Sequence, residues 1–180
     1  MVVSSKPVIS VVITAYNRKE FLLRAVRSVI NQDLPRSLYE VIVIKNFRDN
    51  EIDTTLRGLE VISICMEGKV GEFLVRAIYV ARGEIISFLD DDDLYKPDKL
   101  GKVSKTFTED DELCYYHNAS IFIDSNDNVR EKLLKKQIDE QIRITGNEEN
   151  IKKASSILRL SGSNNLSSIS VRKKLIVNCL

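Results

Sequence analysis

Short, nearly unbroken apolar runs separated by polar segments mark the first half of the chain. The runs at residues 8–14, 39–44 and 85–89 are rich in Val and Ile, and a shorter one lies at residues 61–64. Runs of this length and composition are typical of strands that are buried on both faces of a parallel sheet. We therefore expect a strand at each of the four.

Between these runs, apolar residues recur at helical spacing. The pattern predicts a helix over residues 19–31, with Asn17 as its cap, and a second helix that opens near Gly68 and ends at Gly83 in the C′ position. A third helix is expected to begin at Pro97 and to run to about residue 108. Strands that alternate with helices in this way indicate right-handed crossover units and an α/β fold.

The second half of the chain has a weaker and more mixed pattern. Residues 113–116, 120–123 and 166–171 are predicted as strands, and a final helix is expected to begin near Arg172. Residues 129–160 are charged and weakly periodic, so helical pieces are expected there without defined ends. The change of pattern suggests one domain with two unlike halves.

Four consecutive aspartates, residues 90–93, follow directly after the run at 85–89. Adjacent carboxylates repel one another, and no basic residue follows them until Lys96. A divalent cation would relieve that repulsion, and ligands of open α/β sheets bind at the carboxyl ends of strands. Two alternatives stay open: a solvated turn that caps the next helix through Asp93 or Asp98, and a phosphatase-like Asp-x-Asp strand end.

Composition narrows the class of protein. The chain has 180 residues, 29% charged and 43% hydrophobic, with a net charge of +1, as expected of one soluble domain. This charge gives no electrostatic argument for nucleic acid as a partner. Three widely spaced cysteines predict reduced, mostly buried thiols, and the sequence shows neither a signal peptide nor an apolar run of spanning length. We expect a cytoplasmic protein, with attachment to a membrane surface left open through residues outside this chain.

Four ordered motifs carry a resemblance to a known family. Residues 9–18, 28–32, 81–93 and 97–100, with a weaker echo at 166–173, together resemble family-2 glycosyltransferases of the GT-A fold. The resemblance implies a GT-A-type, Rossmann-like, mostly parallel sheet flanked by helices, followed by a mixed C-terminal acceptor half. In these terms residues 1–180 form a single domain, with residues 8–95 as the nucleotide-sugar-binding half and residues 96–180 as a partial, truncated acceptor half.

The same resemblance implies roles for particular residues. The donor would be a nucleotide-diphosphate sugar, and a Mn²⁺ or Mg²⁺ ion would bridge its pyrophosphate, held by Asp90 and Asp92 of the Asp-x-Asp motif. Asp91 would contact the sugar nucleotide. The residues expected to line the base and ribose pocket are Thr14, Ala15, Tyr16, Arg18 and Asn46. For Tyr16 the alternative is an aromatic side chain of the loop that packs on the sheet.

The chain departs from the family pattern in two places. Lys45, Asn46 and Phe47 stand where such enzymes carry an aspartate pair that reads the base. An amide both donates and accepts, so Asn46 can still bind a base edge, while Lys45 is expected to contact phosphate or to be solvated. No carboxylate here fits the catalytic base of inverting members, which we therefore expect beyond Leu180. The single histidine, His117, is predicted to be structural.

The sequence thus predicts a metal-dependent, inverting glycosyltransferase that moves a sugar to a hydroxyl of a glycan, a lipid carrier or a protein. Two other classes remain as alternatives. A nucleotidyltransferase of similar fold would need a Gly-rich phosphate loop, and residues 14–18 contain no glycine. A non-catalytic sugar-nucleotide-binding or scaffold domain is favoured by the missing base.

Overall fold

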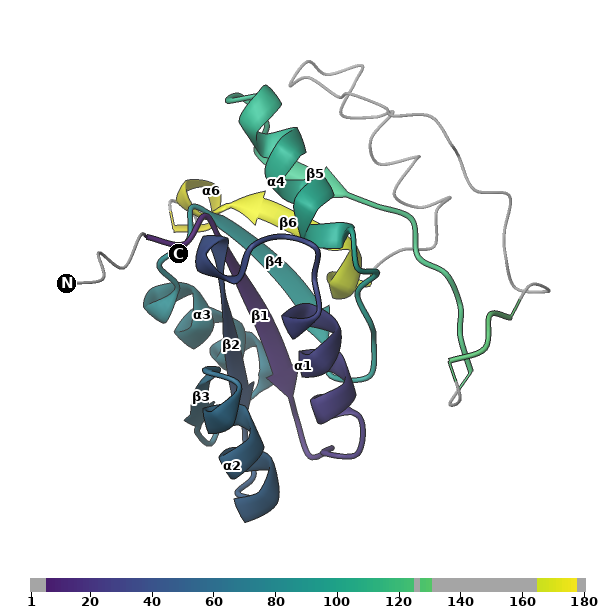
Figure 1. The fold of residues 1–180 in the computed structure, drawn as a ribbon. Helices are drawn as coiled ribbons and strands as arrows, with labels where there is room; N and C mark the ends of the chain where they lie inside the picture. The colour runs from purple at the N-terminus through teal and green to yellow at the C-terminus, as the bar shows by residue number, and fades with distance from the viewer. Residues whose placement is uncertain (1–5, 125–126, 131–164, 178–180) are drawn as a thin grey trace.

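The computed structural model describes residues 6–124, 127–130 and 165–177 (Figure 1). The helical pieces expected within 131–160, and Cys179, lie outside these ranges. The strands are β1 (Ile9–Ala15), β2 (Tyr39–Lys45), β3 (Ile62–Cys65), β4 (Ile85–Asp90), β5 (Tyr115–His117) and β6 (Ile169–Arg172). The helices are α1 (Leu22–Ile30), α2 (Asn50–Gly58), α3 (Val70–Val80), α4 (Lys99–Glu109) and α6 (Lys173–Val177), with 3₁₀ turns at Arg36–Leu38 and Leu166–Ser168.

The described strands form a six-stranded sheet of order β3-β2-β1-β4-β6-β5. β1 pairs in parallel with both β2 and β4, and β2 pairs in parallel with β3. β6 runs antiparallel to β4 on one side and to β5 on the other. This arrangement confirms the predicted mostly parallel α/β sheet, and it joins the C-terminal strand β6 to β4.

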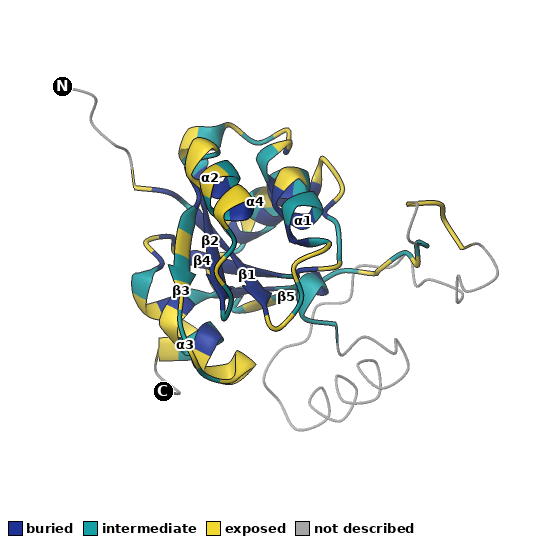
Figure 2. Ribbon diagram, turned by 90° about the horizontal axis from the view of Figure 1, so that it is seen from below, coloured by how far each residue is buried: buried dark blue, intermediate teal, exposed yellow. Residues whose placement is uncertain are grey.

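Two apolar layers sandwich the sheet. One layer contains buried residues of α1, α2 and α4, and the other contains residues of α3 (Figure 1). Figure 2 shows the buried strands between α1, α2 and α4 on one side and α3 on the other. Every residue of β1 is buried, which explains its unbroken apolar run: neighbouring side chains point to opposite faces, and both faces are covered.

Gly83 has a different role from the predicted one. α3 ends at Val80 with Ala81 as its C-cap, so Gly83 lies beyond the C′ position. A Cβ built on Gly83 would lie 2.5 Å from the backbone nitrogen of Ser10 and 2.7 Å from the carbonyl carbon of Ile9. The glycine is required because the chain passes close to β1 as it enters β4.

Several predicted boundaries were also wrong. Residues 120–123 form no strand; Ile123 makes only an isolated bridge with Val129. The first half of the expected strand at 166–171 is a 3₁₀ turn. α1 begins at Leu22 with Phe21 as its N-cap, so Asn17 does not cap it, and α4 begins at Lys99, after Pro97.

Candidate active site

The parallel pairing brings three strand ends to one edge of the sheet. Thr14 of β1 is in register with Ile44 of β2 and with Asp90 of β4. The segments that follow these strands therefore leave the sheet side by side. They are the Tyr16–Arg18 segment, the Asn46–Phe47 segment and the three aspartates after Asp90. The predicted site residues are thus neighbours in the fold, at the position where open α/β sheets bind ligands.

The four aspartates have unlike surroundings. Burial and the nearby charges of Asp93, Asp92 and Asp91 raise the pKa of Asp90 to about 6. Asp91 is 3% exposed, whereas the side chain of Asp92 is 42% exposed. Asp93 accepts a hydrogen bond from the Nδ2 group of Asn165 at 2.9 Å. The half-buried carboxyl of Asp90 is therefore followed, two positions along the chain, by the exposed carboxyl of Asp92.

Arg18 supplies the positive charge that the local sequence lacks. Its Nε donates to Asp91 Oδ2 at 3.1 Å, and its Nη2 donates to the other oxygen of Asp91. Its Nη1 forms an ion pair with Asp92 Oδ2 at 2.9 Å. Bidentate contact of this kind is the geometry that guanidinium groups favour with carboxylates. Asp91 is neutralised inside the protein, and the charges of Asp90 and Asp93 are left without a basic ion-pair partner among the described residues.

This donor set fits a divalent cation that also has ligands from a substrate. Mg²⁺ and Mn²⁺ sites of nucleotide enzymes use one or two carboxylates and complete their coordination with phosphate oxygens and water. Burial is the largest cause of the raised pKa of Asp90, and the negative charges of Asp93, Asp92 and Asp91, which add to it, would favour a positive charge at this place. In the part of the chain that the structure describes, no group of three or more His, Cys, Asp or Glu side chains is arranged to hold a metal alone. Asp90 and Asp92 would therefore supply only part of the coordination of a cation.

The segments after β1 and β2 are tied to each other by two asparagines. The backbone N–H of Asn17 donates to Asn46 Oδ1 at 2.8 Å, and Asn46 Nδ2 donates to Asn17 Oδ1 at 2.7 Å. Asn17 has a φ of 54°, in the left-handed region that asparagine tolerates. Sequence reasoning assigned Asn46 to the pocket but did not identify its partner.

Tyr16, which is 44% exposed, packs its ring against that of Phe73 at a centroid distance of 6.0 Å. Its ring is therefore both supported from the α3 side and accessible from solvent. Thr14 and Ala15 are buried at the end of β1. Thr14 and Ala15 can therefore present only backbone groups or a short side chain to a ligand at this edge of the sheet.

Lys45 is neither solvated nor placed for a phosphate at this edge, which corrects the expectation. Its side chain is 1% exposed and its Nζ lies 2.8 Å from Asp53 Oδ1 of α2. The same Nζ donates to the carbonyl oxygen of Phe47 at 2.5 Å. In β2, Lys45 follows the side-chain alternation of Val41 and Val43, so its side chain points to the α2 face, away from Asn46.

Two residues of the C-terminal segment, which sequence reasoning missed, hold the acidic loop formed by residues 90–93. Asn165 binds Asp93, and the backbone N–H of Asp90 donates to Ser167 Oγ at 2.8 Å. The sequence signals were the polar cluster at residues 162–165, which reads as an ordinary turn, and the weaker family echo at residues 166–173, which gave Ser167 no role. His117 lies in β5 with its Nε2 2.9 Å from Ser168 Oγ, in agreement with a structural role.

Comparison with known proteins identifies the family. The profile described as Glycosyl transferase family 2 matches residues 10–175 of the chain. The chain belongs to this family. An uncharacterized glycosyltransferase of Nostoc sp. is 32% identical over 127 residues, which are 66% of this chain and 38% of the relative. A second uncharacterized glycosyltransferase, from Methanocaldococcus jannaschii, is 29% identical and is matched over 45% of its length. The chain therefore spans less than half of the curated relatives it matches.

Solved structures share the fold of this family-2 domain. The crystal structure of S. aureus TarS 1-349 in complex with UDP-GlcNAc superposes with a TM-score of 0.69 at 16% identity, covering 95% of this chain and 47% of that chain. The mannosyltransferase PcManGT from Pyrobaculum calidifontis, in complex with GDP-Man and Mn²⁺, gives a TM-score of 0.51 at 22% identity, covering 68% and 37%. Among the described residues, no helix is both long enough and apolar enough to cross a membrane.

Proposed function

We propose that the chain is the donor-binding part of a glycosyltransferase that moves a sugar from a nucleotide-diphosphate donor to a hydroxyl acceptor. The observation that carries the proposal is the convergence of Asp90, Asp92 and the Asn17–Asn46 pair at one edge of the sheet. Membership of the family supports it, as do the nucleotide sugars bound to TarS and PcManGT. Nucleotide and divalent cation would meet at that edge.

Each side chain has a proposed task. Asp90 and Asp92 hold Mn²⁺ or Mg²⁺, which, when bound, would neutralise the charge of the departing nucleoside diphosphate. Arg18 keeps Asp91 buried and orients the loop. Because Arg18 already satisfies Asp91, this aspartate reaches the nucleotide only through its backbone or through Arg18.

The base pocket is proposed between Tyr16 and Asn46. Tyr16 offers a ring face to the base, and the amide of Asn46 offers a donor and an acceptor to the edge of the base. Transfer with inversion, by a base outside the described residues, follows from the resemblance to the family.

Calorimetric titration with UDP, GDP, CDP and ADP, each with Mn²⁺ and with EDTA, tests the proposal. We expect one nucleotide to bind clearly better than the rest, and only with Mn²⁺. Loss of a metal ligand should lower the affinity at least as much as loss of a residue that supports a metal ligand. We therefore expect Asp92→Asn to weaken the Mn²⁺-dependent nucleotide binding by about 100-fold.

Asp98→Asn is the matched control. Asp98 is an exposed aspartate that pairs with Lys102 on α4, outside the site. It should bind the nucleotide like the parent protein. Equal nucleotide binding with and without Mn²⁺, or an unaltered affinity in Asp92→Asn, would refute the metal assignment.

A further inference from the structure

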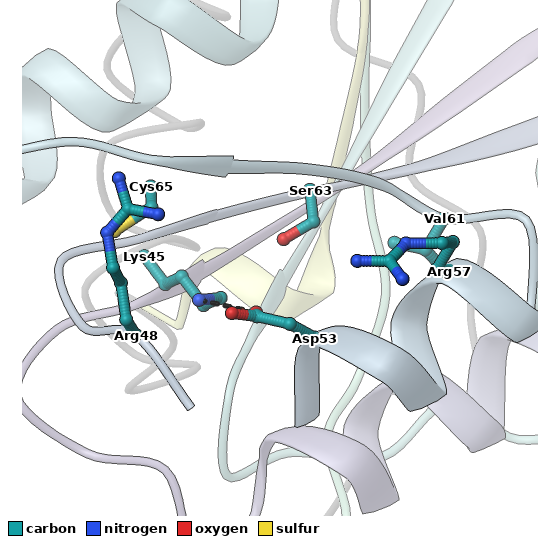
Figure 3. Close-up of a pocket in the computed structure, with 7 residues that line it drawn as sticks. All are labelled: Lys45, Arg48, Asp53, Arg57, Val61, Ser63 and Cys65. Atoms are coloured by element: carbon teal, nitrogen blue, oxygen red, sulfur yellow. Dashed lines mark ion pairs between the residues drawn. The ribbon is translucent and has the colours of Figure 1, made fainter. Parts of the chain in front are cut away.

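A second pocket lies at the outer edge of the sheet, between β3 and α2. Its volume is about 350 Å³. Its lining is mostly polar and is drawn in Figure 3: Lys45, Arg48, Asp53, Arg57, Val61, Ser63 and Cys65. None of these residues belongs to the acidic loop or to the Asn17–Asn46 pair. The pocket is therefore separate from the proposed donor site, although Lys45 adjoins Asn46 in the chain.

The floor of this pocket contains a buried cation with a donor to spare. An ammonium group has three N–H donors. In Lys45 one points to Asp53 Oδ1 at 2.8 Å and one to the carbonyl oxygen of Phe47 at 2.5 Å. The ring of Phe47 also lies over this Nζ, with its centroid at 5.0 Å. Among the described residues no third hydrogen-bond acceptor is present, so one N–H can turn to a ligand in the pocket that Lys45 lines.

Two arginines flank this lysine. Arg48 follows β2 and Arg57 lies in the last turn of α2, and neither side chain forms an ion pair or hydrogen bond with another described residue. In Figure 3 their guanidinium groups stand at opposite ends of the pocket, with the hydroxyl of Ser63 between them and the Lys45–Asp53 pair below. The thiol of Cys65, an exposed residue contrary to the expected burial, donates to the carbonyl oxygen of Phe47 at 3.4 Å.

The charges of this pocket do not cancel. Asp53 neutralises Lys45, and the two guanidinium groups remain as a surplus of positive charge. Exposed arginines alone would be an ordinary solvated surface. Here they surround a hollow with a buried ammonium and the hydroxyl of Ser63, a donor set that matches the oxygens of a phosphate group.

We propose that this pocket binds a phosphate group of a small soluble compound, independently of the metal and of the nucleotide donor. Arg48 and Arg57 close on the phosphate from both ends through their long stems, and Lys45 and Ser63 donate from the sheet. The inference goes beyond the proposed transferase activity and does not depend on it.

Titration with inorganic phosphate in the presence of EDTA, followed by amide chemical shifts, tests the site. We expect saturable shifts at Lys45, Ser63 and Cys65. Because a hydrogen bond to a charged group contributes enough to change binding about tenfold, Arg48→Gln with Arg57→Gln should weaken phosphate binding by about tenfold or more. The control variant, Arg27→Gln with Lys174→Gln, removes two exposed positive charges from α1 and α6 and should bind phosphate normally.

The proposal would be overturned by the absence of a saturable shift, by an unchanged affinity in the Arg48/Arg57 variant, or by an equal loss of affinity in the Arg27/Lys174 control. Sedimentation with phosphatidylglycerol vesicles distinguishes a lipid head group from a free phosphate, and binding to vesicles alone would also contradict it. The Arg48/Arg57 variant should keep the Mn²⁺-dependent nucleotide binding of the parent protein. If the phosphate-site proposal fails, the donor-site proposal is therefore unaffected.

Discussion

At the scale of single residues, Asp90 shows how strongly the surroundings change a side chain. Its carboxyl sits at the end of a buried strand beside three further aspartates, and its pKa rises to about 6. The ionised form is therefore disfavoured in the folded protein without metal, and a cation would reverse this. The same carboxyl that weakens the fold at neutral pH is the one best prepared to bind a metal.

Asp90→Asn should separate these two effects. The folded-state pKa of Asp90 lies above its unfolded value, so the folded chain holds an extra proton between them, and stability falls as pH rises through about 6. In EDTA, Asp90→Asn should therefore raise the melting temperature at pH 8 and leave it nearly unchanged at pH 4. Thermal unfolding at both pH values measures this, and a lower melting temperature at pH 8 would contradict the assigned cause.

The affinity for Mn²⁺ should rise as Asp90 ionises, whereas the stability of the metal-free protein falls. A proton competes with the metal for Asp90, so the affinity should fall by up to about tenfold for each pH unit below about 6. A calorimetric series from pH 7.5 to 5 measures this slope, and a flat series would remove Asp90 from the metal site.

Asn46 is the residue that we expect to influence the choice of base. Asn46→Ala removes both hydrogen-bonding groups and should change the ranking of UDP, GDP, CDP and ADP. Asn17→Gly is the control, since it tolerates the φ of 54° and removes only the side chain that contacts Asn46. Competition binding should show an altered ranking in the first variant and the parent ranking in the second. The same ranking in both would mean that Asn46 only orders the loop.

At the scale of elements, the junction between α3 and β4 is fixed by contacts with β1 and β2. Buried Glu40 of β2 accepts from Ser10 Oγ at 2.7 Å and from the backbone N–H of Arg82 at 2.6 Å, and it pairs with Arg82 Nε at 2.8 Å. Ser10 Oγ in turn accepts from the N–H of Gly83 at 2.9 Å. This network sets where β4 starts, and hence where its acidic end lies.

Gly83→Ala should disrupt that junction. The new methyl group would lie within 3 Å of backbone atoms of Ile9 and Ser10, which cannot rotate away. We expect a loss of about 3 kcal/mol in the free energy of unfolding, from overpacking. Gly101→Ala in α4 is the control, with nothing within 4 Å of its Cβ, and should gain about 1 kcal/mol through helix propensity. Urea unfolding of both variants measures the difference, and equal stabilities would refute the close-approach explanation.

At the scale of the whole molecule, segments distant in the sequence complete one site. β6 lies between β4 and β5, and Ser87 Oγ of β4 lies 2.8 Å from both Ser170 Oγ and Tyr95 OH. The 3₁₀ turn before β6 then places Ser167 against the backbone of Asp90. The acidic loop is therefore held from both the β1 side, by Arg18, and the β6 side.

Ser167→Ala should weaken metal–nucleotide binding without unfolding the protein. It removes the acceptor for the N–H of Asp90, and a hydrogen bond worth about 1 kcal/mol corresponds to roughly a fivefold loss of affinity if the loop must be reordered on binding. Ser37→Ala, at an exposed serine of the 3₁₀ turn before β2, is the control. Calorimetry with Mn²⁺ and the preferred nucleotide measures both, and the same affinity in Ser167→Ala and Ser37→Ala would show that the β6 side does not support the site.

The sequence by itself determined the parallel strands, the helices between them and the acidic strand end, because apolar periodicity is a local property and a strand buried on both faces must be apolar throughout. It also indicated Asn46 and the aspartates, which follow directly after such strands. Only the tertiary structure decided that Arg18 compensates Asp91 across 73 positions, that Lys45 is buried against Asp53, and that Ser167 supports Asp90. Those contacts depend on which strands become neighbours and on which face a side chain points to. Both are consequences of the packing of the whole chain, which no stretch of sequence specifies alone.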